Sequence, residues 1–298
     1  MTDRKQSPAG IFPPLTTPFD PATGDIAPLK FRQNIQRLLA QGVDGVVVSG
    51  STGESPLLDP DEQRHLVGLA REELRDGKWL IAGTGGESTR QTIALSKSAA
   101  AAGADAVLVR PPSYFSAGAT LETLAIHFRA VADASPVPVL IYNIPKYTHL
   151  SLAPALLQQL ASHERIIGVK DSSGDPKNLA AYREAVPQWS VLAGSASLLF
   201  TALELGCQGG VVGVACYAPS LCVQLVREFA QGGGHRAAAG QLQERITPLD
   251  KEIVGKLGPA GVKAAMDAAG LYGGPVRPPL APLSAADRER VSALVRGD

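Results

Sequence analysis

The sequence predicts an α/β fold in which eight parallel strands close into a barrel. Short apolar runs alternate with longer segments of helical period, and eight such pairs follow one another. Fully apolar strands that alternate with helices indicate a parallel sheet covered by helices. Units of roughly 25 to 30 residues fit a (β/α)8 TIM barrel better than an open doubly wound sheet. Helical patterns beyond the eighth unit predict a C-terminal all-helical appendage.

The predicted strands are runs of β-branched and small apolar residues bounded by glycine, proline or polar residues. The first strand lies within 11–19 and is only loosely defined, because prolines interrupt that segment. The other seven are expected at 45–49, 79–83, 106–110, 138–142, 166–170, 191–193 and 210–214.

The predicted helices show apolar residues at helical spacing, with Pro28 at the start of the first and Gly103 at the stop of the third. They are expected at 28–41, 59–75, 88–103, 120–134, 153–162, 176–185 and 198–205, and the eighth unit ends before about residue 231.

Three consecutive glycines, Gly232 to Gly234, mark a break in the chain. We therefore predict a barrel catalytic domain at residues 1–230 and a C-terminal helical extension at 231–298. Helices of the extension are expected near 236–245, 249–256, 261–269 and 285–295.

Composition excludes several classes of protein. Lysine plus arginine equals aspartate plus glutamate at 28 each, so bulk charge gives no attraction to nucleic acid or to anionic membranes. No apolar run approaches 18 residues, and no apolar core follows the charged N-terminal residues, so we expect neither membrane spanning nor secretion. The three cysteines are far apart and are expected to be reduced thiols of a cytoplasmic protein. The five histidines lack ligand spacing, so we expect no metal.

The segment 166–174 combines a short buried strand with a lysine, Lys170, at its C-terminal end. A lysine is rarely buried unless it is paired or used, and burial favours the neutral amine that can attack a carbonyl. Alternatively, Lys170 reaches solvent or pairs with Asp171. Taken alone, the segment favours this structural interpretation.

Two further strand ends carry polar residues, where a barrel of this kind places its chemistry. The turn after 45–49 holds Ser51 and Thr52 between glycines, and their hydroxyls and nearby amides could hold a carboxylate or could cap the next helix. Tyr142 ends the fifth strand, where its phenol could relay protons or could simply pack in the core.

Three other signals are weaker. Gly194, in a small-residue turn after the seventh strand, could let a ligand approach the backbone. Tyr114 follows two prolines after the fourth strand, where a structural or interface role is equally consistent. The glycine-rich segment 83–86 lacks the lysine of a phosphate-binding loop and is discounted.

These motifs together resemble the pyruvate-dependent class I aldolase family that includes dihydrodipicolinate synthase and N-acetylneuraminate lyase. The resemblance covers nearly the whole chain, and three motifs stand in family order at family spacing. They are Gly-Ser-Thr-Gly-Glu at 50–54, Tyr-Asn-Ile-Pro at 142–145 and Val-Lys-Asp-Ser-Ser-Gly at 169–174.

The resemblance implies a role for each strand-end residue. Lys170 would form a Schiff base with a 2-oxo acid, and the phenol of Tyr142 would shuttle protons at the imine. Ser51 and Thr52 would hold the pyruvate carboxylate. Gly194 and the backbone at Val212 would complete the walls. No metal or organic cofactor is implied, and a homotetramer, a dimer of dimers, is expected.

Departures from the synthase pattern bear on the second substrate. Synthases carry an arginine two residues beyond the proline of the Tyr-Asn-x-Pro motif, where this chain has Tyr147, with Lys146 beside it as an uncertain substitute. Ser51 stands where synthases mostly have threonine. The interface tyrosine of the synthases aligns with Ser113, although Tyr114 is adjacent.

The sequence thus favours a lyase that makes or breaks a C–C bond of pyruvate or of a hydroxylated 2-oxo acid that releases pyruvate. Dihydrodipicolinate synthase, which condenses pyruvate with aspartate semialdehyde, is the alternative. A pyruvate-binding sensor without turnover is a third hypothesis, which the joint presence of Lys170 and Tyr142 disfavours.

Overall fold

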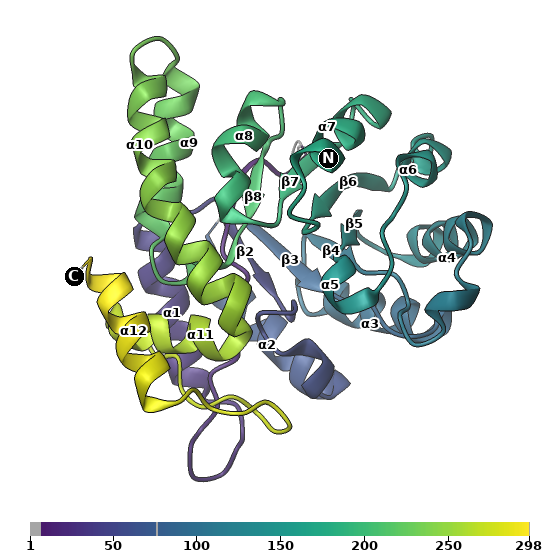
Figure 1. Cartoon of the computed structure of the whole chain (residues 1–298). Helices are drawn as coiled ribbons and strands as arrows, with labels where there is room; N and C mark the ends of the chain where they lie inside the picture. The colour runs from purple at the N-terminus through teal and green to yellow at the C-terminus, as the bar shows by residue number, and fades with distance from the viewer. Residues whose placement is uncertain (1–6, 76, 298) are drawn as a thin grey trace.

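The computed structural model describes residues 7–75 and 77–297 and confirms the predicted barrel. Eight parallel strands pair in the order β1-β8-β7-β6-β5-β4-β3-β2, and helices surround them (Figure 1). The strands are β1 Gly10–Phe12, β2 Gly45–Val48, β3 Trp79–Gly83, β4 Ala106–Val109, β5 Val139–Asn143, β6 Ile166–Asp171, β7 Ser190–Ala193 and β8 Gly209–Val211.

The barrel closes between β1 and β2 by only a few hydrogen bonds. The amide of Leu15 donates to Val47 O at 2.8 Å, and the amide of Val47 donates to Pro13 O at 3.0 Å. Pro13 and Pro14 have no N–H group to extend a ladder, so β1 ends at Phe12 and the chain continues as an extended segment. This explains why the first strand could be predicted only loosely.

Two apolar layers follow from the alternation of side chains along each strand. One cluster fills the barrel interior and includes Phe12, Leu140 and Leu192. The other, which includes Val169 and Val191, lies between the strands and the surrounding helices. Adjacent residues of one strand therefore face different environments, and this fixes which side chains of β6 reach the barrel interior.

The helices agree with the predicted ones apart from their ends. Around the barrel they are α1 Pro28–Ala40, α2 Pro60–Glu73, α3 Thr89–Ala101, α4 Leu121–Ala134, α6 Pro154–Leu160, α7 Pro176–Ala185, α8 Leu199–Glu204 and α9 Pro219–Gln231. Short 3-10 turns lie at η1 Ser55–Leu57, η2 Ser116–Gly118, η3 Ala196–Leu198 and η4 Gly213–Cys216.

Two local expectations were wrong. The eighth strand ends at Val211 and not at residue 214, because the chain turns into η4 from Gly213. The helix expected from residue 198 begins as η3 at Ala196, and α8 starts at Leu199. A short helix that the sequence did not predict, α5 Pro145–Thr148, follows β5 directly.

The C-terminal helices lie against one side of the barrel. Helix α10 His235–Pro248 packs beside α9, as Figure 1 shows. The chain continues without a break through a π-helix, η5 Leu249–Gly255, into α11 Lys256–Ala268, which kinks at Gly258 and Pro259. Helix α12 Ala285–Arg296 packs on α11. Within the described residues, no helix is long and apolar enough to cross a membrane.

Candidate active site

Lys170 lies near the C-terminal end of β6, with Tyr142 of β5 and Leu192 of β7 as its neighbours in the sheet. Tyr142 and Leu192 belong to the interior layer, so Lys170 shares that face. Its side chain is only 5% exposed, and its Nζ lies 4.1 Å from the centre of the Tyr142 ring. Within residues 7–75 and 77–297, Lys170 Nζ forms no hydrogen bond or ion pair.

Asp171 does not neutralise Lys170. Its carboxylate accepts hydrogen bonds from Asn143 Nδ2 at 2.7 Å, from Ser173 Oγ at 2.7 Å and from Asn178 Nδ2 at 3.0 Å. Burial raises the pKa of Asp171, and these hydrogen bonds act against that rise. Because adjacent strand residues face opposite sides, the pairing of Lys170 with Asp171 that the sequence allowed is not formed.

A cavity of about 460 Å³ opens at the C-terminal end of the barrel and brings most of the predicted residues together. Its lining includes Lys170, Tyr142, Ser51, Thr52, Gly194 and Tyr147. Tyr142 and Lys170 lie at the ends of the neighbouring strands β5 and β6, Gly194 follows β7, and Ser51 and Thr52 follow β2, which is not adjacent to those three strands. The cavity is therefore enclosed by strand ends, which is where enzymes with this fold hold their substrates.

The hydroxyls of Ser51 and Thr52 are not used as helix caps. Helix α2 is capped by Asp59, whose side chain accepts from the Glu62 amide while Glu62 accepts from the Asp59 amide. In the described part of the chain neither hydroxyl has a hydrogen-bond partner, and both residues line the cavity. The capping interpretation is therefore wrong, and the two hydroxyls are available to a ligand.

A buried ion pair holds the turn that carries these hydroxyls. Glu54 ends the turn with a left-handed φ of 60°, and its Oε1 lies 2.5 Å from Lys263 Nζ. Lys263 also donates to Pro275 O at 2.6 Å, and the Arg277 amide donates to Glu54 Oε2 at 2.8 Å. Lys263 is the other fully buried lysine among the described residues, but its amine is occupied by these partners, unlike that of Lys170.

Gly194 and Val212 were expected in the walls near the substrate. Gly194 lines the cavity, and a Cβ there would lie 1.9 Å from Ser172 Oγ and 2.7 Å from Asp171 O, so no larger residue fits. Val212, expected there through its backbone, is not among the residues that line the cavity, and its fully buried side chain packs in the outer layer. Its neighbours Val211 and Gly213 line the cavity instead.

Tyr147 lies on α5 at the rim of the cavity and is 46% exposed. Partial burial, together with the nearby Tyr142, raises the pKa of the Tyr147 phenol, so it stays neutral and can donate a hydrogen bond. Lys146 donates its Nζ to Gly255 O at 2.8 Å and lies 5.6 Å from the centre of the Tyr147 ring. The chain thus presents a phenol at this rim and no guanidinium.

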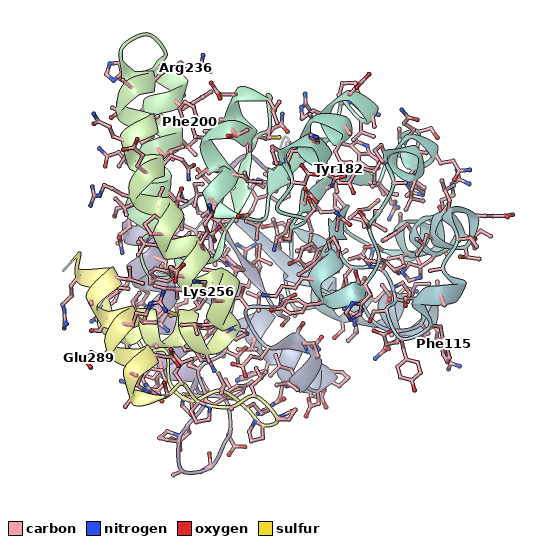
Figure 2. The ribbon with its side chains drawn as sticks, viewed as in Figure 1. Phe115, Tyr182, Phe200, Arg236, Lys256 and Glu289 are labelled. Carbon is pink, nitrogen blue, oxygen red and sulfur yellow. The ribbon has the colours of Figure 1, made fainter. Side chains whose placement is uncertain are left out.

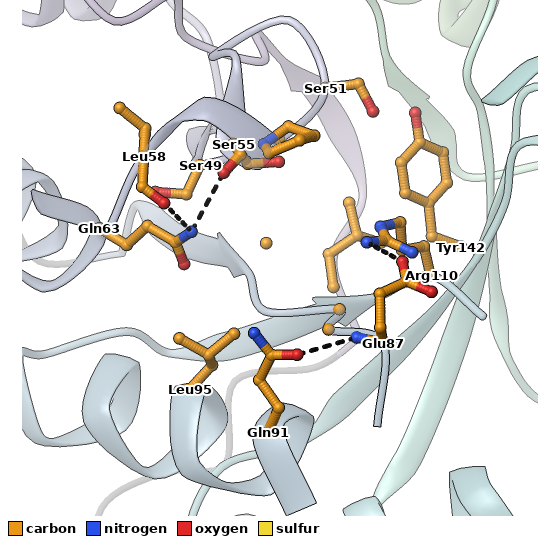
Figure 3. Close-up of a pocket in the computed structure, with 16 residues that line it drawn as sticks. Ser49, Ser51, Ser55, Leu58, Gln63, Glu87, Gln91, Leu95, Arg110 and Tyr142 are labelled. Atoms are coloured by element: carbon orange, nitrogen blue, oxygen red, sulfur yellow. Dashed lines mark hydrogen bonds and ion pairs between the residues drawn. The ribbon is translucent and has the colours of Figure 1, made fainter. Parts of the chain in front are cut away.

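A second cavity of about 270 Å³ adjoins the first and shares Ser51 and Tyr142 with it. In Figure 3 these two side chains lie at one end of it, beside the Arg110–Glu87 pair. Burial alone would raise the pKa of Glu87, but the amides of Tyr114 and Ser113 and the Arg110 guanidinium lower it to about 2. Glu87 is therefore an ionised carboxylate, and its bonds to the Ser113 and Tyr114 amides hold the loop after β4 in place.

The same loop shows how Ser113 and Tyr114 differ. Ser113 Oγ donates to Glu87 Oε1 at 3.0 Å, whereas the Tyr114 side chain is 81% exposed and stacks edge-on against Phe115. Ser113 is therefore engaged within its own chain. Tyr114 is the one of the two whose ring is open to a neighbouring molecule.

Sequence reasoning missed Asp250 and Ser172, which also line the cavity. Asp250 lies on the π-helix, 80 residues beyond Lys170 in the chain, and nothing in its local pattern indicates that η5 covers the barrel mouth. Ser172 lies inside the motif that carries Lys170, so that motif could have indicated it.

The fold and this site define a class: a (β/α)8 enzyme with a buried lysine, unpaired within the described residues, and a tyrosine at the mouth of the barrel, as in class I aldolases. The chain belongs to the dihydrodipicolinate synthetase family, whose model matches residues 7–297. Members of this family are lyases and aldolases, which confirms the resemblance and the enzyme class inferred from the sequence.

The similar proteins include one named as a lyase and one named as a synthase. The chain is 38% identical over 286 residues to an uncharacterized DapA-like lyase of Halobacterium salinarum, covering 95% of this chain and 92% of that protein. It is 35% identical over 273 residues to the 4-hydroxy-tetrahydrodipicolinate synthase of Methanopyrus kandleri, covering 91% and 90%.

Among solved structures, YagE, a prophage protein of this family from E. coli K12 in complex with pyruvate, matches with a TM-score of 0.90 at 30% identity. The match covers 97% of this chain and 98% of that one. The dihydrodipicolinate synthase DapA-2 of Bacillus anthracis matches with a TM-score of 0.92 at 28% identity, covering 100% and 99%.

Proposed function

We propose that this protein is a lyase that forms a Schiff base between Lys170 and a hydroxylated 2-oxo acid and releases pyruvate. The observation that carries the proposal is the state of Lys170: its amine is buried, unpaired within the described residues, and open to a cavity beside the Tyr142 ring. A structural lysine would be satisfied by partners, as Lys263 is by Glu54 and Pro275.

The reaction follows from these groups. The neutral amine of Lys170 adds to the C2 carbonyl to give a carbinolamine, and transfer of a proton to its hydroxyl followed by loss of water gives a protonated imine. Loss of the C4 hydroxyl proton then breaks the C3–C4 bond, which releases an aldehyde and leaves its electron pair as a neutral enamine. Protonation at C3 and hydrolysis return the amine and release pyruvate. Tyr142, whose ring lies 4.1 Å from Lys170 Nζ, relays the protons.

The hydroxyls of Ser51 and Thr52 are proposed to bind the C1 carboxylate. Both line the cavity with no partner in the described chain, and the Glu54–Lys263 pair holds their turn in place. Hydrogen bonds to a charged group are among the stronger ones, so two hydroxyls on a fixed turn can orient a small carboxylate. The small walls at Gly194, Val211 and Gly213 leave room for the planar 2-oxo acid.

The experiment that tests the proposal is a panel of 2-oxo acids, each assayed for release of pyruvate. The panel includes 4-hydroxy-2-oxo acids with different substituents beyond C4 and the same acids without the C4 hydroxyl. We expect release only from acids that carry the hydroxyl, because its proton must leave for the bond to break. Pyruvate binding without turnover of any member would instead support the sensor hypothesis.

The alternative function is 4-hydroxy-tetrahydrodipicolinate synthesis, the activity in the name of the Methanopyrus kandleri relative. Tyr147 argues against this activity. The carboxylate of aspartate semialdehyde needs a paired cation at the partly dehydrated rim of the cavity, and Tyr147 supplies a neutral phenol there. Lys146 lies close by, but its Nζ is engaged with Gly255 O.

We therefore predict weak or absent condensation of pyruvate with aspartate semialdehyde by the wild type. Tyr147→Arg should raise it about 10-fold or more, since a guanidinium can pair with the substrate carboxylate. The half-exposed rim leaves space for the longer side chain. A coupled assay on both proteins measures this, with Tyr147→Phe as the control that loses the phenol and gains no charge. Efficient wild-type synthesis, at about 1 to 10³ per second, would overturn the lyase assignment.

We further propose that the protein is a homotetramer, a dimer of dimers. The Tyr114–Phe115 pair supports an interface, since both rings are more than 80% exposed, and Figure 2 shows Phe115 pointing away from the body of the chain. Sedimentation should show four chains of 31.0 kDa together. A monomer at micromolar concentration would contradict this proposal.

We propose that the protein is cytoplasmic, with a barrel domain at residues 1–230 and a helical extension at 231–298. The three cysteines are buried free thiols, which suits a reducing compartment. Because η5 of the extension contributes to the cavity, the barrel domain is expected to need residues 231–298 for a complete site and to release no pyruvate without them. Expression of 1–230 alone, followed by the pyruvate-release assay, tests this.

A further inference from the structure

Asp250 is a buried carboxylate at the mouth of the barrel. It is 6% exposed and lines the same cavity as Lys170, although it comes from the π-helix η5 and not from a strand end. Its Oδ2 accepts three hydrogen bonds, from Ser195 Oγ at 2.6 Å, from Ser197 Oγ at 2.7 Å and from the Ser197 amide at 2.9 Å. These bonds fix the carboxylate in one orientation.

The second carboxylate oxygen of Asp250, Oδ1, has no hydrogen-bond partner among the described residues. It is also not one of the unpartnered polar atoms that are completely shielded from solvent. The open space next to Asp250 is the cavity. A buried carboxylate oxygen without a partner is costly, so this oxygen is a ready acceptor for a ligand group.

Two serines beside Asp250, Ser195 and Ser197, make this part of the cavity wall a hydrogen-bond acceptor. Ser195 and Ser197 both line the cavity, and both spend their hydroxyl protons on Asp250. Their oxygens can then only accept hydrogen bonds from a ligand. The wall after β7 therefore presents acceptors, and it lies on a different side of the barrel from the Ser51–Thr52 turn after β2.

We infer that Asp250 is a specificity-determining residue that accepts a hydrogen bond from a hydroxyl on the substrate tail, beyond the bond that is cleaved. This inference rests on the proposed function and names its substrate class, 4-hydroxy-2-oxo acids with additional hydroxyls. A carboxylate-bearing tail offers only acceptors and carries the same charge as Asp250, so this wall disfavours it. Lys146 and Lys251 also line the cavity, but both are exposed, and Lys146 is bonded to Gly255 O.

The test compares three 4-hydroxy-2-oxo acids by kcat/KM for pyruvate release, each supplied as both C4 epimers. One carries an alkyl tail, one is 4,5,6-trihydroxy-2-oxohexanoate, and one carries a terminal carboxylate. We expect the wild type to prefer the trihydroxy acid over the alkyl acid by about 10- to 100-fold, the range for a hydrogen bond to a charged group. Asp250→Asn replaces the charged acceptor at Oδ1 with a neutral donor while keeping the shape, and should lower this ratio several-fold, because the charge-assisted bond is lost.

The matched control is Glu252→Gln, two residues further along η5. Glu252 pairs with Lys256 at 2.7 Å and with Arg290 at the surface, away from the cavity, so the ratio should stay as in the wild type. A ratio that stays within twofold of wild type in Asp250→Asn would overturn the inference, as would a wild type that prefers the carboxylate tail.

Failure of this inference and failure of the proposed function give different results. Trapping of pyruvate on the enzyme by borohydride involves no tail. A wild type that traps no pyruvate overturns the proposed function. A wild type that traps pyruvate and releases it equally well from all three acids overturns the role of Asp250 alone. The double variant Ser195→Ala with Ser197→Ala should lower the same ratio, because it removes the hydroxyls that orient Asp250. It therefore tests Asp250 even if Asp250→Asn prevents folding.

Discussion

Lys170→Ala is expected to abolish pyruvate release from every 2-oxo acid, with a loss of about 10⁴-fold or more. The substitution removes the nucleophile, and the groups around it cannot form an electron sink without the covalent bond. The measurement is kcat/KM on the best substrate of the panel, together with thermal unfolding to show that the barrel is intact.

Lys256→Ala is a suitable control. Lys256 pairs with Glu252 at 2.7 Å and is not among the cavity residues, so its loss should leave turnover near the wild-type rate. Retained turnover in Lys170→Ala would show that another amine does the chemistry. Lys263 would then be the first to consider, although Glu54 and Pro275 occupy it in this structure.

Tyr142→Phe is expected to slow turnover by about 10²- to 10⁴-fold, the usual contribution of a positioned acid or base. The ring would keep its packing beside Lys170 Nζ and only the phenolic oxygen would be lost. Because the carboxylate is held by other groups, KM should change much less than kcat. Steady-state kinetics and the rate of imine trapping separate these two effects.

Tyr182→Phe provides the matched comparison for that variant. Tyr182 is fully buried, and its hydroxyl donates to Leu152 O at 2.5 Å outside the cavity. Its loss should affect stability but not kcat. If Tyr142→Phe stays within twofold of wild type, Tyr142 is a packing residue, which is the structural interpretation that the sequence also allowed.

The barrel could be predicted from the sequence because each unit carries its own signals. Apolar runs such as 79–82 and 106–109 are buried on both faces, and proline starts and serine or aspartate caps mark the helices, as at Asp59 and Ser88. The ends of β8 and α8 depend on tertiary contacts, and their prediction was inaccurate there. The closure at β1 depends on where Pro13 and Pro14 remove N–H donors.

The candidate site was predictable only where its residues follow strands. Ser51, Tyr142, Lys170 and Gly194 stand directly after apolar runs, so the fold alone brings them to one end of the barrel. Asp250 could not be predicted, because a π-helix that continues α10 carries it over the barrel mouth. Val212, whose backbone was expected near the substrate, is not among the lining residues, whereas its neighbours Val211 and Gly213 are.

The most direct test of the central claim is to incubate the protein with pyruvate and borohydride, weigh the intact chain, and map the modified peptide. We expect a mass increase of one reduced pyruvate per chain, located on Lys170, and no increase in Lys170→Ala. An unmodified chain, or a modification on any other lysine, would contradict it.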